Sequence, residues 1–400
     1  MHARTILTTV MNKAMPTMHS RRRDTLLSVV NSALDGARLT VTSLGRGIVG
    51  NAFEKHRIKR ADRLLSNKRL SAERPGIYRA LARQITSSSP RPVIHIDWSN
   101  LDRGKTRYLL RAAVAVEGRA FTLYEEVHPR ERFMKQRVER QFLKRLAQVL
   151  GPQARPIIVT DAGFLNPWRR AVLALGWDFV CRIRGRVMLS EPDGENWQHA
   201  RSLYAQARIR AKRLTQRRLS RQNPLSCHFV LVRGKRGSRH DFNCYGSRAR
   251  GHNSNKKARS QREPWLLATS LDISEASAIK RVVNCYRTRM QIEESFRDLK
   301  STTFGLGYEA ARSSRVERIE LLLLIATLVV YLAWLIGLCV QQAGRHRRYQ
   351  ANTVKTRTVL SLVYLGRRAW RDHLNQHTSA ALQSAQHDLT AKALDYDAMR

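Results

Sequence analysis

Three carboxylates stand at positions from which their side chains could converge on metal ions. Asp97 and Asp161 each end a short apolar run that is typical of a buried strand, Val93–Asp97 and Pro156–Asp161. Glu293 belongs to a later helical pattern. Two acids at adjacent strand ends and one on a packed helix can hold two divalent cations about 4 Å apart, the arrangement that serves in-line displacement at phosphorus. Carboxylate oxygen is the ligand that Mg²⁺ prefers, and Mn²⁺ is tolerated.

A predicted helix from about Ser274 to Lys300 gathers polar residues on one stripe. Because a helix turns by about 100° per residue, the spacing aligns Tyr286, Arg289, Glu293 and Lys300. The apolar residues beside this stripe, which would hold the helix against a sheet, are Ile292, Phe296 and Leu299. A surface helix also pairs Arg and Glu at this spacing, so a salt bridge between Arg289 and Glu293 is an alternative interpretation. Asp97 and Asp161 could likewise be acids that only cap strand ends.

The charge of the chain points to a polyanionic partner. Lysine and arginine number 73 against 31 aspartate and glutamate residues, which leaves a formal net charge of +42. A compact chain of this charge repels itself unless a polyanion neutralises it, and the usual polyanion is nucleic acid. The composition therefore argues against a metabolic enzyme with a small neutral substrate. Hydrophobic residues make up 42% of the chain, which is enough for a buried core.

The five cysteines predict no disulfide framework. They are odd in number and contain no CxxC pair, which favours a reduced, cytosolic compartment. One grouping, Cys227 and His228 with His240 and Cys244, could be a zinc site, although its spacing is not that of a standard finger.

The order of the predicted elements indicates an α/β fold. Two strands flank Glu117-Gly118-Arg119 as a hairpin after the Asp97 strand. A helix, the Asp161 strand, a second helix and another strand follow, at 137–150, 156–161, 167–175 and 177–184. The order β-β-β-α-β-α-β, with an acid at the end of two of the strands, is typical of a ribonuclease H-like core. Such a core is a mixed sheet flanked by helices.

The chain divides by pattern into five regions. A helical N-terminal region that binds DNA spans 1–88, and the first part of the core spans 89–185. A basic, β-rich insertion occupies 186–270. The second part of the core, 271–345, contains the Glu293 helix and an apolar helix. A helical C-terminal region, 346–400, is a candidate for dimerisation.

Two segments allow more than one interpretation. Leu321–Val340 carries no charge and is long enough to span a bilayer, but a helix at the centre of a large domain is also apolar all round. The N-terminal region carries many cations on short elements, which could form a solvated face or contact phosphates. Those considered as DNA contacts are Arg46, His56, Lys59, Arg60 and Arg63.

The spacing Tyr286-x2-Arg289-x3-Glu293-x6-Lys300 resembles the signature of the insertion-sequence-four family of DDE transposases. Further segments are similar to this family, close to its insertion-sequence-ten transposases: Lys55-His56, Ile58–Arg60, Arg63–Leu65, Val159–Phe164, Glu195–Trp197, Glu263–Trp265, Met290–Glu294, Phe296–Ser301 and Gln350–Thr353. The similarity runs from about residue 35 to about residue 370. Met290 departs from the family pattern, since tryptophan is common at that position.

The resemblance implies a cut-and-paste DNA transposase. Such a protein would bind terminal inverted repeats as a homodimer in a synaptic complex. It would cut both strands through 3′-hydroxyl attack and a hairpin intermediate, and then join the ends to double-stranded target DNA. Two Mg²⁺ ions, replaceable by Mn²⁺, are the implied cofactors. Neither a small-molecule substrate nor a membrane is expected, because Leu321–Val340 would be a core helix, and the implied location is the bacterial cytoplasm, at the nucleoid.

The resemblance also implies roles for single residues. Asp97, Asp161 and Glu293 would be the catalytic metal ligands. Phosphates of the transposon end would be held by Tyr286, Arg289 and Lys300. Trp265 would stack against a flipped base, since an extruded base needs a stacking surface, although a tryptophan there could also belong to the core.

Two alternatives to an active transposase remain at the level of sequence. A transposase relative could bind DNA without cutting it, and the intact acids and signature argue against this. A membrane-anchored nucleic-acid-binding protein would use Leu321–Val340 as its anchor.

Overall fold

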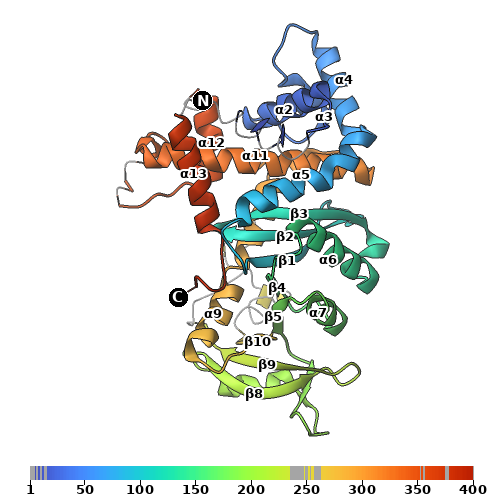
Figure 1. The fold of residues 1–400 in the computed structure, drawn as a ribbon, viewed down its shortest axis with the longest axis vertical. Helices are drawn as coiled ribbons and strands as arrows, with labels where there is room; N and C mark the ends of the chain where they lie inside the picture. The colour runs from blue at the N-terminus through green and yellow to red at the C-terminus, as the bar shows by residue number, and fades with distance from the viewer. Residues whose placement is uncertain are drawn as a thin grey trace. The chain divides into compact units, whose positions relative to one another are not determined.

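The computed structural model forms two compact units, drawn as ribbons in Figure 1. The first comprises residues 1–154 and 290–395, and the second comprises residues 155–289 and 396–400. The structure describes residues 16–234, 263–351, 356–373 and 378–399, together with the short pieces 5, 8, 9, 11, 12, 247, 251, 252, 254, 255, 353 and 354.

A three-stranded antiparallel meander is the centre of the first unit. Its strands are β1 (Val93–Asn100), β2 (Arg107–Val116) and β3 (Arg119–Pro129). The two-residue loop of Glu117 and Gly118 has positive φ angles, 41° and 84°, as a type I′ turn requires. The predicted hairpin is confirmed.

Helices cover both faces of this meander. Helix α6 (Gln136–Leu150) packs on one face with buried residues that recur at helical spacing, among them Phe142, Leu143 and Leu146. Helices α10 (Met290–Lys300) and α11 (Val316–Gln342) pack on the other face. Helix α5 (Lys68–Thr86) contacts both α6 and β3.

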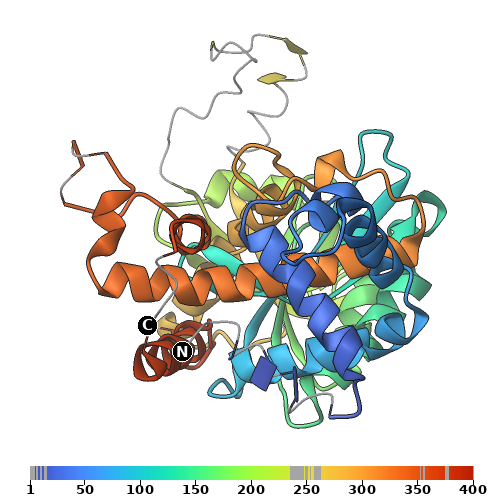
Figure 2. The same ribbon diagram turned by 90° about the horizontal axis from the view of Figure 1, so that it is seen from above.

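Three further helices begin the first unit. They are α2 (Ser20–Leu34), α3 (Val41–Arg46) and α4 (Glu54–Leu65). Helix α2 lies above α11 in Figure 1, crosses it in Figure 2 and contacts it. Helices α3 and α4 approach closely at Gly45, where an added Cβ would lie only 2.4 Å from the Cα of Ile58. A larger residue at this position would force the two helices apart.

Helix α11 is the core helix of the first unit. Of the described residues, it is the one helix long and apolar enough to cross a membrane, but 94% of its most apolar window is buried inside the protein. It packs against β3, α2, α5, α12 (Leu362–Arg371) and α13 (Ser379–Lys392). Contact with α12 depends on glycine, since a Cβ on Gly366 would lie 1.7 Å from the carbonyl oxygen of Ala333. Short 3₁₀ helices lie at Arg130–Arg132, Tyr308–Ala310 and Arg345–Arg348.

The second unit is a strand-rich α/β unit. Its strand order is β4-β5-β10-β9-β8-β6-β7. The pair β4–β5 is parallel and the other pairs are antiparallel. The strands are β4 (Ile157–Thr160), β5 (Asp178–Ile183), β6 (Met188–Ser190), β7 (Gln198–His199), β8 (Lys212–Leu219), β9 (Leu225–Val232) and β10 (Trp265–Thr269), and the helices are α7 (Asn166–Leu173), η2 (Ala200–Gln206) and α9 (Ala276–Arg287).

Candidate active site and nucleic-acid interface

Asp97 lies within β1 and not at its end. The sequence pattern ended the strand at this acid, but pairing with β2 continues to Asn100, which is opposite Tyr108. Trp98 explains the extension, because its ring packs against His128 and its indole nitrogen donates to Glu139 Oε1 over 3.2 Å. The Trp98 backbone N–H donates to Asp97 Oδ1 over 2.9 Å, and the aspartate is half-buried. The strand therefore holds this carboxylate in a defined orientation.

Helix α10 presents Glu293 from its first turn. Its buried face is formed by Ile292, Phe296 and Leu299, as the sequence predicted, and Glu293 beside them is half-buried. Glu293 and Lys300 are seven residues apart and share one flank of the helix.

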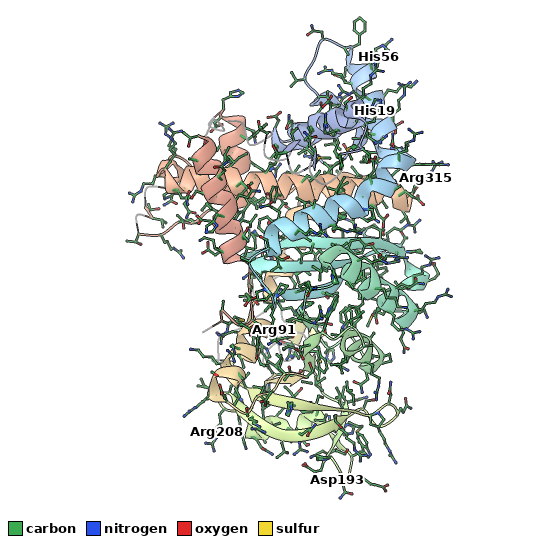
Figure 3. The ribbon with its side chains drawn as sticks, viewed as in Figure 1. His19, His56, Arg91, Asp193, Arg208 and Arg315 are labelled. Atoms are coloured by element: carbon green, nitrogen blue, oxygen red, sulfur yellow. The ribbon has the colours of Figure 1, made fainter. Side chains whose placement is uncertain are left out.

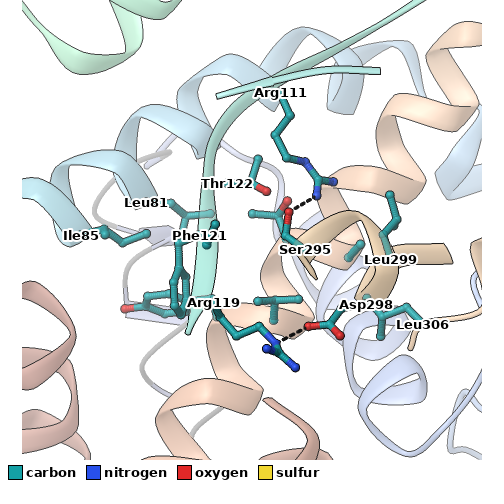
Figure 4. Close-up of a pocket in the computed structure, with 15 residues that line it drawn as sticks. Leu81, Ile85, Arg111, Arg119, Phe121, Thr122, Ser295, Asp298, Leu299 and Leu306 are labelled. Atoms are coloured by element: carbon teal, nitrogen blue, oxygen red, sulfur yellow. Dashed lines mark hydrogen bonds and ion pairs between the residues drawn. The ribbon is translucent and has the colours of Figure 1, made fainter. Parts of the chain in front are cut away.

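Polar contacts from all three strands hold α10 on the sheet. Lys300 Nζ donates to Ser99 Oγ of β1 over 2.8 Å. Arg111 of β2 donates to Ser295 Oγ over 3.1 Å, and Arg119 at the start of β3 pairs with Asp298 over 2.7 Å. Figure 4 shows the last two contacts as dashed lines. Each strand of the meander thus fixes one point of the helix.

The contact between Lys300 and Ser99 brings the helix flank next to Asp97. Ser99 lies two residues after Asp97, so both side chains point to the same face of β1. Burial lowers the pKa of Lys300 below its usual value, and the nearby charge of Arg111 lowers it further. A phosphate group close to this ammonium would offset both effects.

Asp161 belongs to the second unit and directly follows β4, as predicted. Its Oδ1 accepts the backbone N–H of Gly163 over 2.8 Å, an arrangement in which the side chain closes a tight turn. Buried Phe164 and Trp168 follow, with ring centroids 4.7 Å apart, and anchor the turn in the core. The strand on one side of the carboxylate and the buried aromatic residues on the other therefore fix its position within the unit.

An aromatic and cationic cluster lies in the same unit as Asp161. The rings of Trp265 and Tyr286 meet edge to face with centroids 5.0 Å apart, and Arg289 lies 5.9 Å from the centre of the Tyr286 ring. Burial raises the pKa of Tyr286, while Arg289 and Arg182 lower it and Asp161 raises it. The tyrosine is therefore within electrostatic reach of both the guanidinium groups and the carboxylate.

Arg182 is a member of this cluster that the sequence pattern did not single out. It lies on β5 opposite Leu267 of β10, and its side chain is only 11% exposed. Burial lowers the pKa of its guanidinium, and a hydrogen bond with Tyr286 opposes this effect. An arginine within the apolar run Phe179–Ile183 was the signal that could have drawn attention to it.

The helix predicted from Ser274 to Lys300 is broken in two. Helix α9 ends at Arg287 and α10 begins at Met290. Thr288 Oγ1 donates to the carbonyl oxygen of Cys285 over 2.9 Å, and the Arg289 N–H donates to Tyr286 O in a tight turn. Threonine thereby offers the backbone an alternative to helical hydrogen bonding. Two signature residues, Tyr286 and Arg289, belong to the second unit, whereas Glu293 and Lys300 belong to the first.

The N-terminal cations lie on the outer surface of α3 and α4. His56, Lys59, Arg60 and Arg63 are exposed, while Ala61, Leu64 and Leu65 of the same helix are buried. Figure 3 labels His56 at the outer end of this region. Arg46 pairs with Glu54 over 2.8 Å, but both side chains are more than half exposed, so the pair adds little stability.

Arg60 and Arg63 line an open groove of about 330 Å³ between α2 and α4, together with His19, Arg21 and Arg22. Arg60 Nε also donates to Thr25 Oγ1 over 3.2 Å, which links the two helices. A basic groove of this kind suits a phosphate backbone, although an exposed cationic face is also common on soluble helices.

Within neither unit do the described residues bring three or more His, Cys, Asp or Glu side chains together in a group that could hold a metal ion. Asp97 and Glu293 lie in the first unit and Asp161 in the second. His240 and Cys244 of the considered zinc grouping lie outside the described residues.

Carboxylates on a strand and on a helix packed over it can hold the metal ions that serve phosphoryl transfer. A family model described as a transposase DDE domain matches residues 88–332, more than half of the chain. The chain therefore belongs to the DDE transposase family, and its core has the ribonuclease H-like fold that the sequence predicted. No match was found among curated proteins.

Membership of this family makes the chain a transposase, a protein that acts on DNA. Such proteins typically use divalent metal ions. The burial of α11 agrees with a protein that works on DNA and not within a bilayer.

Proposed function

We propose that the chain is a cut-and-paste DNA transposase of the insertion-sequence-four family, close to the insertion-sequence-ten transposases. In this proposal a homodimer binds the terminal inverted repeats, cleaves both strands through 3′-hydroxyl attack and a hairpin, and joins the ends to target DNA. The protein would act in the bacterial cytoplasm, at the nucleoid. The observation that carries the proposal is the seating of the Glu293 helix on the Asp97 strand, through Lys300 and Ser99, inside the region matched by the family.

The chemistry of the donor set suits a divalent metal ion. Asp97 and Glu293 are half-buried carboxylates on packed elements, and Asp161 closes a tight turn. Oxygen ligands of this type are those that Mg²⁺ and Mn²⁺ take. When bound, two such ions would activate the attacking oxygen and stabilise the leaving oxygen. The three acids come from both units, and a cleavage assay in solution tests whether they act together.

The remaining signature residues would bind DNA. Arg289 suits a bidentate phosphate contact, because its guanidinium is a planar fork, whereas Lys300 acts as a point charge. Tyr286 would keep Arg289 in place through a hydrogen bond, and Arg182 would in turn hold Tyr286. Half-buried Trp265 would offer a ring to a base extruded during hairpin formation. The exposed cations Arg46, His56, Lys59, Arg60 and Arg63 would contact the backbone of the transposon end.

Cleavage of a labelled duplex tests this proposal. The duplex carries the terminal sequence of the element that encodes the chain, and wild type is compared with Asp161→Ala in Mg²⁺ and in EDTA. We expect nicked and hairpin products with wild type in Mg²⁺ and neither product in EDTA or with the variant. Binding without cleavage by both proteins would instead indicate a transposase relative that has kept only DNA binding.

A further inference from the structure

Arg111 is a buried arginine that the proposed chemistry does not use. It lies in the middle of β2, directly opposite Asp97 of β1 on one side and Glu125 of β3 on the other. Residues opposite one another on neighbouring strands point to the same face, with Cβ atoms about 5 Å apart. Only 3% of Arg111 is exposed, so its charged group is buried on the face of the sheet that also carries Asp97.

Glu125 is the carboxylate that neutralises Arg111. Two guanidinium nitrogens, Nε and Nη2, each lie 2.8 Å from Glu125 Oε2. The other oxygen, Oε1, accepts from Tyr78 over 2.8 Å and from Thr327 over 3.3 Å. The pair is therefore held by residues of α5 and α11 as well as by the sheet.

A β-bulge brings Glu125 to this face. The hairpin loop sets Val116 opposite Arg119, a register that would place Tyr124 opposite Arg111. One extra residue on β3, at the shift between Ala112 and Ala113, moves Glu125 into that place. Because a shift of one residue turns every side chain to the other face, the ion pair exists only because of the bulge.

The guanidinium nitrogen of Arg111 that does not contact Glu125 binds the helix that carries Glu293. Its Nη1 donates to Ser295 Oγ, two residues after Glu293, and its guanidinium lies 5.0 Å from the centre of the Phe296 ring. Figure 4 shows the arginine reaching from its strand to the helix.

The packing around α10 leaves a small gap at this point. A cavity of about 30 Å³ remains between the helix, β3 and α11, lined by Arg111, Thr122, Ser295 and Thr327 among others. This volume has room for about one water molecule. At the edge of this gap the hydrogen bond from Arg111 to Ser295 is a directional contact between β2 and the helix.

We propose that Arg111 is a positioning residue for the metal site, which sets Glu293 on α10 relative to Asp97 on β1. This inference rests on the proposed function, because it takes both carboxylates as metal ligands. A buried ion pair is by itself weak evidence for stability, since apolar residues often replace one without loss. The link from the pair to both acid-bearing elements is what gives Arg111 a role beyond stability.

The test measures Mn²⁺ binding to the full chain on its end duplex by electron paramagnetic resonance, with DNA affinity and circular dichroism as parallel readouts. Ser295→Ala removes the link to α10 and keeps the ion pair. Arg111→Met with Glu125→Gln removes the pair without leaving a buried charge. Arg111→Lys keeps a charge for Glu125 but lacks the fork that reaches Ser295. Glu294→Gln, on the same helix in an exposed pair with Arg297, is the matched control.

We expect Mn²⁺ affinity to fall about fivefold in the first three variants, the effect of one lost hydrogen bond, with unchanged DNA affinity. The control should bind Mn²⁺ like wild type. If Ser295→Ala and the double variant bind Mn²⁺ within twofold of wild type while Asp97→Ala loses it, the positioning role is wrong and the proposed function stands. If Asp97→Ala also binds Mn²⁺ normally, the metal site itself is wrong.

Discussion

Removal of Arg111 alone should destabilise the protein far more than removal of the whole Arg111–Glu125 pair. Glu125 is 0% exposed, and Arg111 is the cation that contacts it, at 2.8 Å. Arg111→Met leaves this buried carboxylate with the hydroxyl donors of Tyr78 and Thr327, and with Arg74 near it but bonded to the backbone carbonyl of Glu125. Breaking a buried pair in this way costs about 3–5 kcal/mol.

The double variant Arg111→Met with Glu125→Gln should avoid that cost, because it leaves no buried charge. The glutamine side chain that replaces Glu125 is uncharged, and its amide oxygen can still accept the hydrogen bond from Tyr78. We expect the free energy of unfolding of the double variant to return to within about 1–2 kcal/mol of wild type, since a buried pair is often replaced without loss.

Urea unfolding followed by circular dichroism measures both variants and Glu125→Gln alone, which completes a double-mutant cycle. A coupling free energy of at least about 2 kcal/mol is expected for a pair in direct contact at this depth. Arg111→Met as stable as the double variant would refute the reasoning, because it would mean that the buried Glu125 carboxylate does not depend on Arg111.

Three further predictions concern stability and DNA binding. Burial raises the pKa of Glu139, and the hydrogen bond from Trp98 only partly offsets this, so wild type loses stability as the pH rises and this buried acid ionises. Glu139→Gln, which cannot ionise, should therefore raise the urea midpoint more at pH 8 than at pH 5. An equal effect at the two pH values would contradict the assignment. Gly366→Ala should lower the free energy of unfolding by about 1–3 kcal/mol, the range for overpacking, because its Cβ would meet the Ala333 backbone. Gly234→Ala, whose Cβ would point into open space, is the control and should be as stable as wild type. Equal thermal stability of Gly366→Ala and wild type would disprove the close crossing. Arg60→Ala and Arg63→Ala should each weaken DNA binding regardless of the DNA sequence and reduce the salt slope of the affinity by about 1. Filter binding at several salt concentrations measures this slope. An unchanged slope would indicate that these arginines form a solvated face and do not contact phosphates.

Local patterns predicted the elements of the fold well. The Glu117-Gly118 loop, the apolar face of α10 and the strand before Asp161 follow from turn chemistry and periodicity within a few residues. The apolar stretch Leu321–Val340 was ambiguous in sequence, because a core helix and a membrane helix have the same composition. Only the folded structure distinguishes the two, because it buries this helix against β3 and the surrounding helices.

Features that depend on distant partners could not be predicted. The extension of β1 beyond Asp97 depends on Trp98 meeting Glu139, 41 residues later. The break at Thr288 depends on a side-chain hydroxyl that competes with the helix. Arg111 meets Glu125 only through a bulge, and a regular hairpin would have put the two side chains on opposite faces.

Replacement of the proposed metal ligands by cysteine tests the central claim most directly. Thiolate is a poor ligand for Mg²⁺ but binds softer ions better. For Asp97→Cys, Asp161→Cys and Glu293→Cys we expect that cleavage of the end duplex is lost in Mg²⁺ and recovered in Mn²⁺, while Glu294→Cys cleaves in both. Full cleavage in Mg²⁺ by Glu293→Cys, with loss in Glu294→Cys, would contradict the account.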